Sequence, residues 1–238
     1  MVNSTDLVLE FLESCIHQVL YSKGVYPVSV FEKRFKYGHQ VFQSRHPHIN
    51  SYIRKVLGNV HPLMDAGLVE SVVVVLNKDK EESTENREMP VEHITISCAV
   101  KNRVSTNDDD GEDTMITEEN RGINKSSEYR VHEASLFELE KHMKNALLDL
   151  LKMQKLPEEY TYSWNLHVHT RKSSVGVNPQ QDAVLRESLA SKQWMVKDDD
   201  GEQALPFSDD GDDPRAVHGI GGFSNSIISV NMTSTTFS

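Results

Sequence analysis

The sequence has little of what membrane, secreted and disulfide-rich proteins require. It contains only two cysteines, Cys15 and Cys98, and neither belongs to a CxxC or CxxH pattern. We interpret both as buried free thiols in a reducing compartment. No charged-then-apolar signal peptide begins the chain, and no segment approaches the roughly 20 apolar residues of a membrane span. We therefore expect a soluble intracellular protein with no membrane association.

Motifs for catalysis are also missing. The sequence has no phosphate-binding GxxxxGK[ST], no GxSxG and no HExxH. The segment 219–222 (GIGG) resembles the start of a dinucleotide-binding loop, but Ser224 stands where the third glycine belongs. The acidic runs would place Thr106, Val196 or Pro206 at the first position of a calcium loop, where a carboxylate is required. We expect a protein that is not an enzyme and uses no cofactor.

Five histidines form the one group of residues with metal-binding character. His167 and His169 alternate on one predicted strand, and His39, His46 and His48 come earlier. A structural zinc site needs four ligands, and no nearby cysteine completes one. We interpret them as histidines on exposed faces and predict no metal site.

Positive charge is scarce, and the deficit is uneven. The net charge is −11, yet residues 1–80 carry nine Lys and Arg against seven Asp and Glu. Residues 81–238 hold the other 16 basic and 29 acidic side chains. Because phosphate repels such a protein and no basic run relieves the repulsion, we expect no direct, tight binding to nucleic acid.

Apolar spacing predicts helices packed on a small mixed or antiparallel sheet, an α+β fold. One apolar face with helical spacing runs from Val8 to Leu20, and Gly24 follows it as a helix-ending glycine. A second predicted helix begins at Pro47, is bent or broken by Pro62 and is closed by Gly67. Strands are predicted at 69–76 and 89–100, and the first of them is apolar enough to be covered on both faces.

The rest of the chain alternates between charged and ordered segments. Residues 101–130 are dense in charge and predict a disordered acidic insertion. A helix is expected at 133–153, and strict alternation over 160–169 predicts a half-buried strand. Beyond Arg171 the apolar residues are isolated, apart from the short stretch 226–230 (SIISV). We interpret 172–238 as an arm that cannot hold a core of its own.

Residues 6–77 resemble the HORMA domain family, and within it the accessory, non-catalytic subunits of translesion DNA polymerase zeta. The residues that carry this resemblance follow the first helix in a fixed order: Gly24-Val25-Tyr26-Pro27, Phe31, Lys36-Tyr37, His46-Pro47, Tyr52, Pro62-Leu63 and the 72–75 strand. Spindle-checkpoint members share the first part. The His-Pro signature before Tyr52, MPVEHITI at 89–96, LHVHTR at 166–171 and Trp194 favour the polymerase subunits.

The resemblance implies a HORMA fold in which residues 1–171 form the core and 172–238 form its C-terminal safety belt. In this family the belt crosses a short partner peptide and pins it against the sheet. The implied partner is a proline-containing peptide of the polymerase zeta catalytic subunit, in support of translesion synthesis and DNA damage tolerance. Implied further partners are other translesion polymerases and an AAA+ remodelling ATPase, and the implied location is the nucleus, with the cytoplasm as a second location.

The resemblance also implies peptide-binding residues. Tyr52 and Trp194 match aromatic residues that contact the peptide, although a tyrosine on the apolar face of its helix also suits a core position. Val217, after Pro214-Arg215, stands where the family has a larger aliphatic contact, and Tyr37 belongs to the shared signature. Pairing as a homodimer or HORMA heterodimer would use the predicted helix 133–153. That helix has no arginine, although an arginine is the family's pairing residue.

Three alternatives stay open at this point. A spindle-checkpoint-type HORMA protein would entrap a peptide of a mitotic regulator by the same mechanics. A role in DNA end protection would use the same belt. A hydrolase or metal enzyme would require the histidines to converge.

Overall fold

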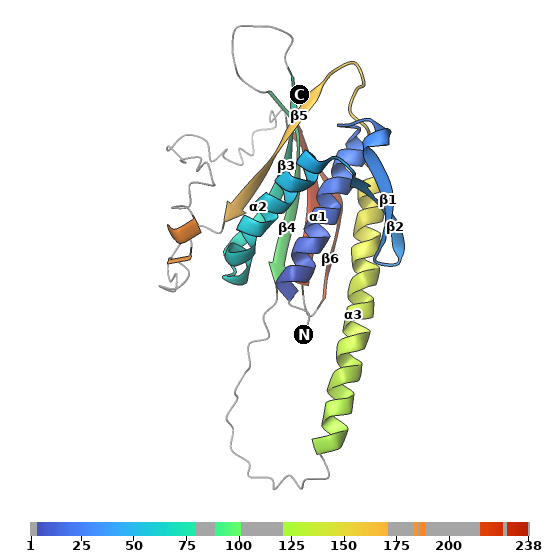
Figure 1. Ribbon diagram of the computed structural model, residues 1–238, viewed down its shortest axis with the longest axis vertical. Coiled ribbons are helices and arrows are strands. Elements are labelled where there is room, and N and C mark those ends of the chain that lie inside the picture. Colours follow the sequence, from blue (N-terminus) through green and yellow to red (C-terminus); the bar gives the residue numbers. More distant parts are fainter. Residues whose placement is uncertain are drawn as a thin grey trace.

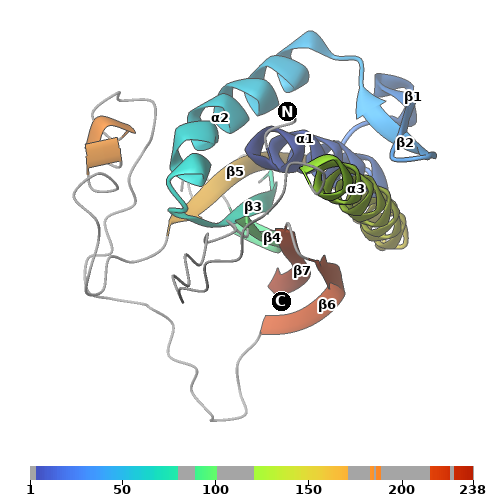
Figure 2. The ribbon, with the colours of Figure 1, turned by 90° about the horizontal axis from the view of Figure 1, so that it is seen from below.

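The computed structural model describes residues 4–79, 89–100, 121–170, 183–184, 186–188, 215–225 and 228–237. A five-stranded antiparallel sheet in the order β5–β3–β4–β7–β6 carries three helices on one face, and a separate β1–β2 hairpin lies beside α1 (Figures 1 and 2). The elements are α1 (Ser4–Lys23), the 3-10 turn η1 (Val28–Val30), β1 (Phe31–Lys36), β2 (His39–Ser44), α2 (Pro47–Asp65), β3 (Val69–Lys78), β4 (Met89–Val100), α3 (Arg121–Leu151), β5 (Tyr162–Thr170), β6 (Arg215–Ser224) and β7 (Ile228–Phe237). The α+β prediction is confirmed.

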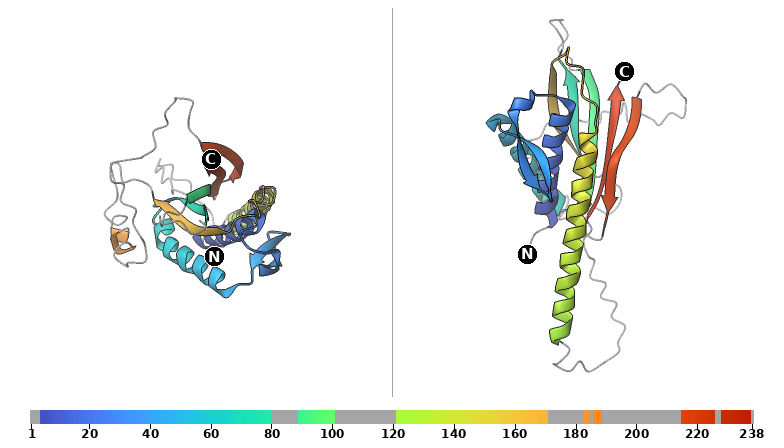
Figure 3. Two further views of the ribbon diagram at one scale, coloured as in Figure 1. Left: turned by 90° about the horizontal axis from the view of Figure 1, so that it is seen from above. Right: turned by 90° about the vertical axis from the view of Figure 1, so that its right-hand side faces the viewer.

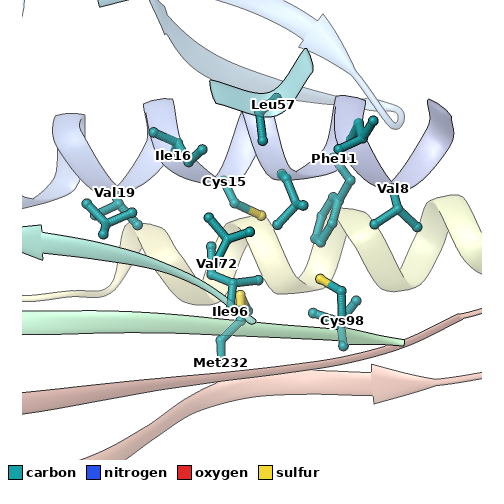
Figure 4. Close-up of a cluster of buried hydrophobic side chains, with 14 of the residues drawn as sticks. Val8, Phe11, Cys15, Ile16, Val19, Leu57, Val72, Ile96, Cys98 and Met232 are labelled. Atoms are coloured by element: carbon teal, nitrogen blue, oxygen red, sulfur yellow. The ribbon is translucent and has the colours of Figure 1, made fainter. Parts of the chain in front are cut away.

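Helix α1 forms the centre of the core. Its apolar residues meet side chains from β3, β4 and β7 in one cluster, which includes Val72, Ile96 and Met232 (Figure 4). The helix ends as predicted: Gly24 adopts a φ of 71°, and its amide donates to the Tyr21 carbonyl at 3.1 Å. Because α2, α3 and β2 also pack on α1, nearly its whole circumference is buried.

Helix α2 runs further than the sequence suggests. It begins at Pro47 as predicted, continues through Pro62 and ends at Asp65, so the expectation that Pro62 could break it is wrong. A proline at this point removes one amide near the end of the helix, and the turns before it are anchored by buried Ile53, Leu57 and Val60. Gly67, at φ 69°, then lets the chain reverse into β3.

The predicted strands at 69–76 and 89–100 form the centre of the sheet. β3 pairs with β5 on one side and β4 on the other, and β4 pairs with β7. Pro90, which the sequence allowed only at a strand start or edge, lies at the start of β4 opposite Asn77, where the register shifts. The predicted strand at 160–169 forms β5 and begins slightly later than expected, at Tyr162.

Helix α3 is the main departure from the expected elements. It begins at Arg121, so its first turns include residues 121–130, which the charge pattern assigned to a disordered insertion (Figures 1 and 3). Residues 101–120 lie outside the described residues. Leu139, Met143 and Leu147 pack in the core. Extending a nucleated helix adds one hydrogen bond per residue, so a helix can continue beyond its packed segment.

The C-terminal residues complete the sheet. β6 and β7 form a hairpin, and β7 pairs with β4 along the length of that strand. Ile228, Val230 and Met232 lie in the main core cluster, at the alternating positions that a half-buried strand requires. Sequence reasoning saw only the short apolar stretch, because the rest of the hairpin is rich in Gly, Ser and Thr.

Candidate functional site

A groove lies between β5, η1 and the start of α2. It has a volume of about 430 Å³. Its lining residues are Tyr26, Val30, His46, His48, Ile49, Tyr52, Trp164 and Asn165. Aromatic and aliphatic walls with a few polar groups are typical of a ligand site.

Three aromatic side chains hold the groove in shape. The Trp164 indole N–H donates to the Tyr26 hydroxyl at 2.8 Å, which ties β5 to the segment before η1. The Tyr52 and Trp164 rings meet edge to face, with centroids 5.2 Å apart. Tyr52 is 38% exposed, so part of its ring is open to a ligand although the residue lies on the apolar side of α2.

The outer edge of β5 forms one border of the groove. Within the described residues, β5 pairs with a strand on its β3 side only. The Leu166 amide points away from β3 and donates to the Tyr52 hydroxyl at 3.2 Å. Because backbone groups alternate along an antiparallel strand, Trp164 and Val168 direct their N–H and C=O groups off the same edge. An extended peptide placed here would find hydrogen-bonding partners on either side of Leu166.

The opposite edge of the sheet is occupied by the β6–β7 hairpin, which packs closely on its neighbours. A side chain at Gly222 would place its Cβ 2.6 Å from the Val230 carbonyl oxygen. Phe223 stacks on His142 of α3, with centroids 5.5 Å apart, and meets Phe11 of α1 edge to face at 6.0 Å. The GIGG segment, which resembled a phosphate loop in the sequence, is therefore a β-strand that fits tightly into the sheet.

The sequence-predicted site residues fall in different places. Tyr52 lines the groove. Tyr37 lies in the β1–β2 turn at φ 50°, against Phe11 and outside the groove lining, and burial raises the pKa of its hydroxyl. Val217 is 65% exposed on β6, the edge strand opposite β5. Trp194 lies outside the described residues.

Sequence reasoning missed Tyr26 and Trp164 as groove residues. Trp164 lies within the predicted strand 160–169, but the position of that strand at an edge depends on the sheet order. Tyr26 stood in the resemblance only as part of a loop signature. A large aromatic residue in each of two distant segments is a weak signal, because such residues more often fill a core.

The rest of the described chain shows no reactive centre. Both cysteines are free and buried; burial raises the pKa of Cys15 well above its ordinary value and that of Cys98 to about 12. Buried thiols of this kind are poor nucleophiles. In the ranges that the structure describes, no three His, Cys, Asp or Glu side chains come together in a way that could hold a metal ion. No helix within those ranges is long and apolar enough to cross a membrane.

Comparison with known proteins agrees with the fold. The HORMA domain family profile matches residues 4–181. The mitotic spindle assembly checkpoint protein MAD2B of Rattus norvegicus is 41% identical over 104 residues, which cover 44% of this chain and 46% of that protein. The DNA polymerase zeta processivity subunit of Arabidopsis thaliana is 31% identical over 94 residues, 40% of each chain. The chain thus spans less than half of the length of these relatives.

Solved structures show the same fold at low sequence identity. A chain of the mitotic checkpoint complex superposes with a TM-score of 0.60 at 17% identity, covering 99% of both chains. HTP-1 of C. elegans, bound to the HIM-3 closure motif, gives a TM-score of 0.55 at 13% identity, covering 98% of this chain and 89% of that one. The expected fold and the likeness to a polymerase zeta subunit are confirmed by these matches. Since the family profile covers most of the sequence, the chain belongs to the HORMA domain family.

Proposed function

We propose that this chain is a non-catalytic adaptor that entraps a short proline-containing peptide of the DNA polymerase zeta catalytic subunit, in support of translesion DNA synthesis and DNA damage tolerance. The observation that carries the proposal is the groove beside β5, where an aromatic wall and a strand edge lie together. The peptide adds to β5 as a further strand, and Tyr52 and Trp164 pack against its side chains.

The order of strands supports entrapment rather than simple docking. β5 lies at one edge of the sheet, the β6–β7 hairpin at the other, and residues 171–214 join them. We propose that residues 172–238 form the safety belt of the 1–171 core, and that the part of the belt before β6, which includes Trp194, closes over the peptide. Release then requires the hairpin to separate from β4, a rearrangement that would suit an AAA+ remodelling ATPase.

The comparisons support the choice of ligand. A relative named as a polymerase zeta processivity subunit matches this chain, and a structural neighbour, HTP-1, is bound to a closure motif. We propose a nuclear location from the same relationship. Other translesion polymerases, and a second HORMA domain paired through α3, are proposed as further partners.

A second candidate function is entrapment of a mitotic regulator peptide, as in spindle-checkpoint HORMA proteins. The observation that favours it is the name of the rat relative, which is that of a spindle assembly checkpoint protein. The groove and the strand order are equally compatible with this ligand.

Co-purification with a proline-containing peptide of the polymerase zeta catalytic subunit tests the first proposal. Wild type should capture the peptide with slow dissociation, and Tyr52→Ala and Trp194→Ala should lose it. Phe35→Ala is the matched control, since Phe35 is an aromatic residue that is 75% exposed on β1 and outside the groove lining. Circular dichroism establishes that each variant is folded.

The outcomes separate the two candidates. Absence of capture by folded wild type, together with capture of a mitotic regulator peptide in a parallel assay, would replace the polymerase ligand with the checkpoint ligand. Absence of capture of both peptides would refute entrapment at this groove. Equal capture by wild type and Tyr52→Ala would place the peptide elsewhere on the molecule.

A further inference from the structure

Positive and hydrogen-donating groups gather at the end of the groove where α2 begins. His46 and His48 both line it, with their rings 5.5 Å apart. The preceding Arg45 is exposed, and its guanidinium donates to the carbonyl of Ser29 in η1, which holds the side chain next to the groove wall. This rim is therefore formed by one arginine and two imidazoles.

The other groove groups add donors but no charged acceptor. The Tyr26 hydroxyl accepts a hydrogen bond from Trp164, and the Tyr52 hydroxyl accepts one from Leu166, so the proton of each hydroxyl remains available to a ligand. No carboxylate is among the lining residues in the part of the chain that the structure describes.

The start of α2 also favours a negatively charged ligand. Pro47 occupies the first turn, no acidic side chain follows in that turn, and His46 makes no side-chain capping hydrogen bond. The partial positive charge of a helix N-terminus is therefore not neutralised locally. The protein has a net charge of −11, so a groove with a basic rim and no carboxylate in its lining differs from the overall charge of the chain.

We infer that the groove selects peptides that carry an aspartate or glutamate next to the residue anchored against Tyr52 and Trp164. The carboxylate would accept hydrogen bonds from Arg45, His46 and His48, while the apolar neighbour fills the aromatic part of the groove. This inference rests on the proposed function, because it specifies the chemistry of the entrapped peptide.

The remaining lining groups offer no competing charge. β5 contributes Trp164 and Asn165, and η1 contributes Val30. A peptide with the neutral amide in place of the carboxylate lacks the charge that the Arg45 guanidinium would bind.

Selection from a displayed peptide library with one fixed proline and randomised flanks tests the inference on the full chain. Wild type should enrich aspartate and glutamate beside the anchor position. The best peptide is then compared with its Asn or Gln counterpart by isothermal titration. We expect the acidic peptide to bind about five- to tenfold more tightly than its amide counterpart.

Variants assign the effect to the rim. Arg45→Gln and His48→Gln should reduce the preference for the acidic peptide and leave binding of its amide counterpart nearly unchanged. His61→Gln is the matched control, because His61 lies on the same helix but contacts Asp6 and Asp65 instead of the groove. Peptide binding with no acidic preference, or a preference that survives both rim variants, would overturn the inference alone. Failure of the folded wild type to bind any library peptide would overturn the proposed function as well.

Discussion

Substitution of Glu92 by glutamine should cost this fold much of its stability, because Glu92 belongs to a buried ion pair. The Lys23 ammonium lies 2.6 Å from one Glu92 oxygen, and the Ser234 hydroxyl donates to the other at 2.5 Å. The side chains of Lys23 and Glu92 are only 7% and 4% exposed. The three residues connect the end of α1 to β4 and to the C-terminal strand β7.

The expected magnitude follows from this burial. Glu92→Gln leaves the Lys23 charge buried with no ion-pair partner among the described residues, and breaking such a pair costs about 3–5 kcal/mol. A domain of ordinary stability has about 5–15 kcal/mol in total, so the variant should be marginally folded. The double substitution Lys23→Met with Glu92→Leu removes both charges, and it should recover most of the loss.

Urea denaturation followed by circular dichroism measures these differences. The matched control is Glu10→Gln, which removes the exposed pair between Glu10 and Lys36 and should cost about 1 kcal/mol or less. A Glu92→Gln variant that loses no more stability than Glu10→Gln would refute the reasoning. So would a double variant that is less stable than Glu92→Gln alone.

Three further substitutions test other parts of the fold. Gly222→Ala should loosen the β6–β7 hairpin, because the new methyl group would lie 2.6 Å from a β7 carbonyl oxygen. Gly219→Ala is the control, since a methyl group there meets nothing within 4 Å. The rate of hydrogen exchange of the β7 amides should rise only in Gly222→Ala. The nearby imidazole of His17, whose Nε2 lies 3.9 Å from a Glu13 carboxylate oxygen, lowers the pKa of Glu13. A depressed carboxyl pKa stabilises the fold above the unfolded value, so Glu13→Gln should lower the stability at neutral pH. The urea midpoints of Glu13→Gln and wild type should then converge as pH falls through the lowered value. Tyr52→Phe should lose about 1 kcal/mol of stability with its hydrogen bond to β5 and still capture peptide through its ring, and full loss of capture in a pull-down would contradict this.

Most of the fold was accessible from sequence because its central elements carry clear apolar patterns. Val8 to Leu20 follows a helical spacing that no strand could satisfy, and residues 160–169 alternate as only a half-buried strand does. Elements whose burial depends on partners were harder to predict. Residues 121–132 show no helical apolar spacing in the sequence, and β6 is a glycine-rich strand whose place is set by β7 and α3.

The candidate site was predictable only in part, for a related reason. Tyr52 could be named from its helix and from the family signature. The groove also needs Trp164 on an edge strand and Tyr26 before η1, and these two residues are 138 positions apart in the chain. Whether a strand lies at an edge or in the middle of a sheet depends on the whole topology. The pattern of residues within one strand does not predict that position.

The placement of β5 and the β6–β7 hairpin at opposite edges has a kinetic consequence. If residues 171–214 enclose the peptide as proposed, the peptide leaves only after β7 separates from β4, a pairing that extends from Glu92 to Val100. The free energy of that local opening would then set the residence time of every ligand. Peptides that differ widely in how fast they are captured would share nearly one lifetime. Differences in affinity between them would then appear in the association rate, whereas in related complexes they usually lie in the dissociation rate.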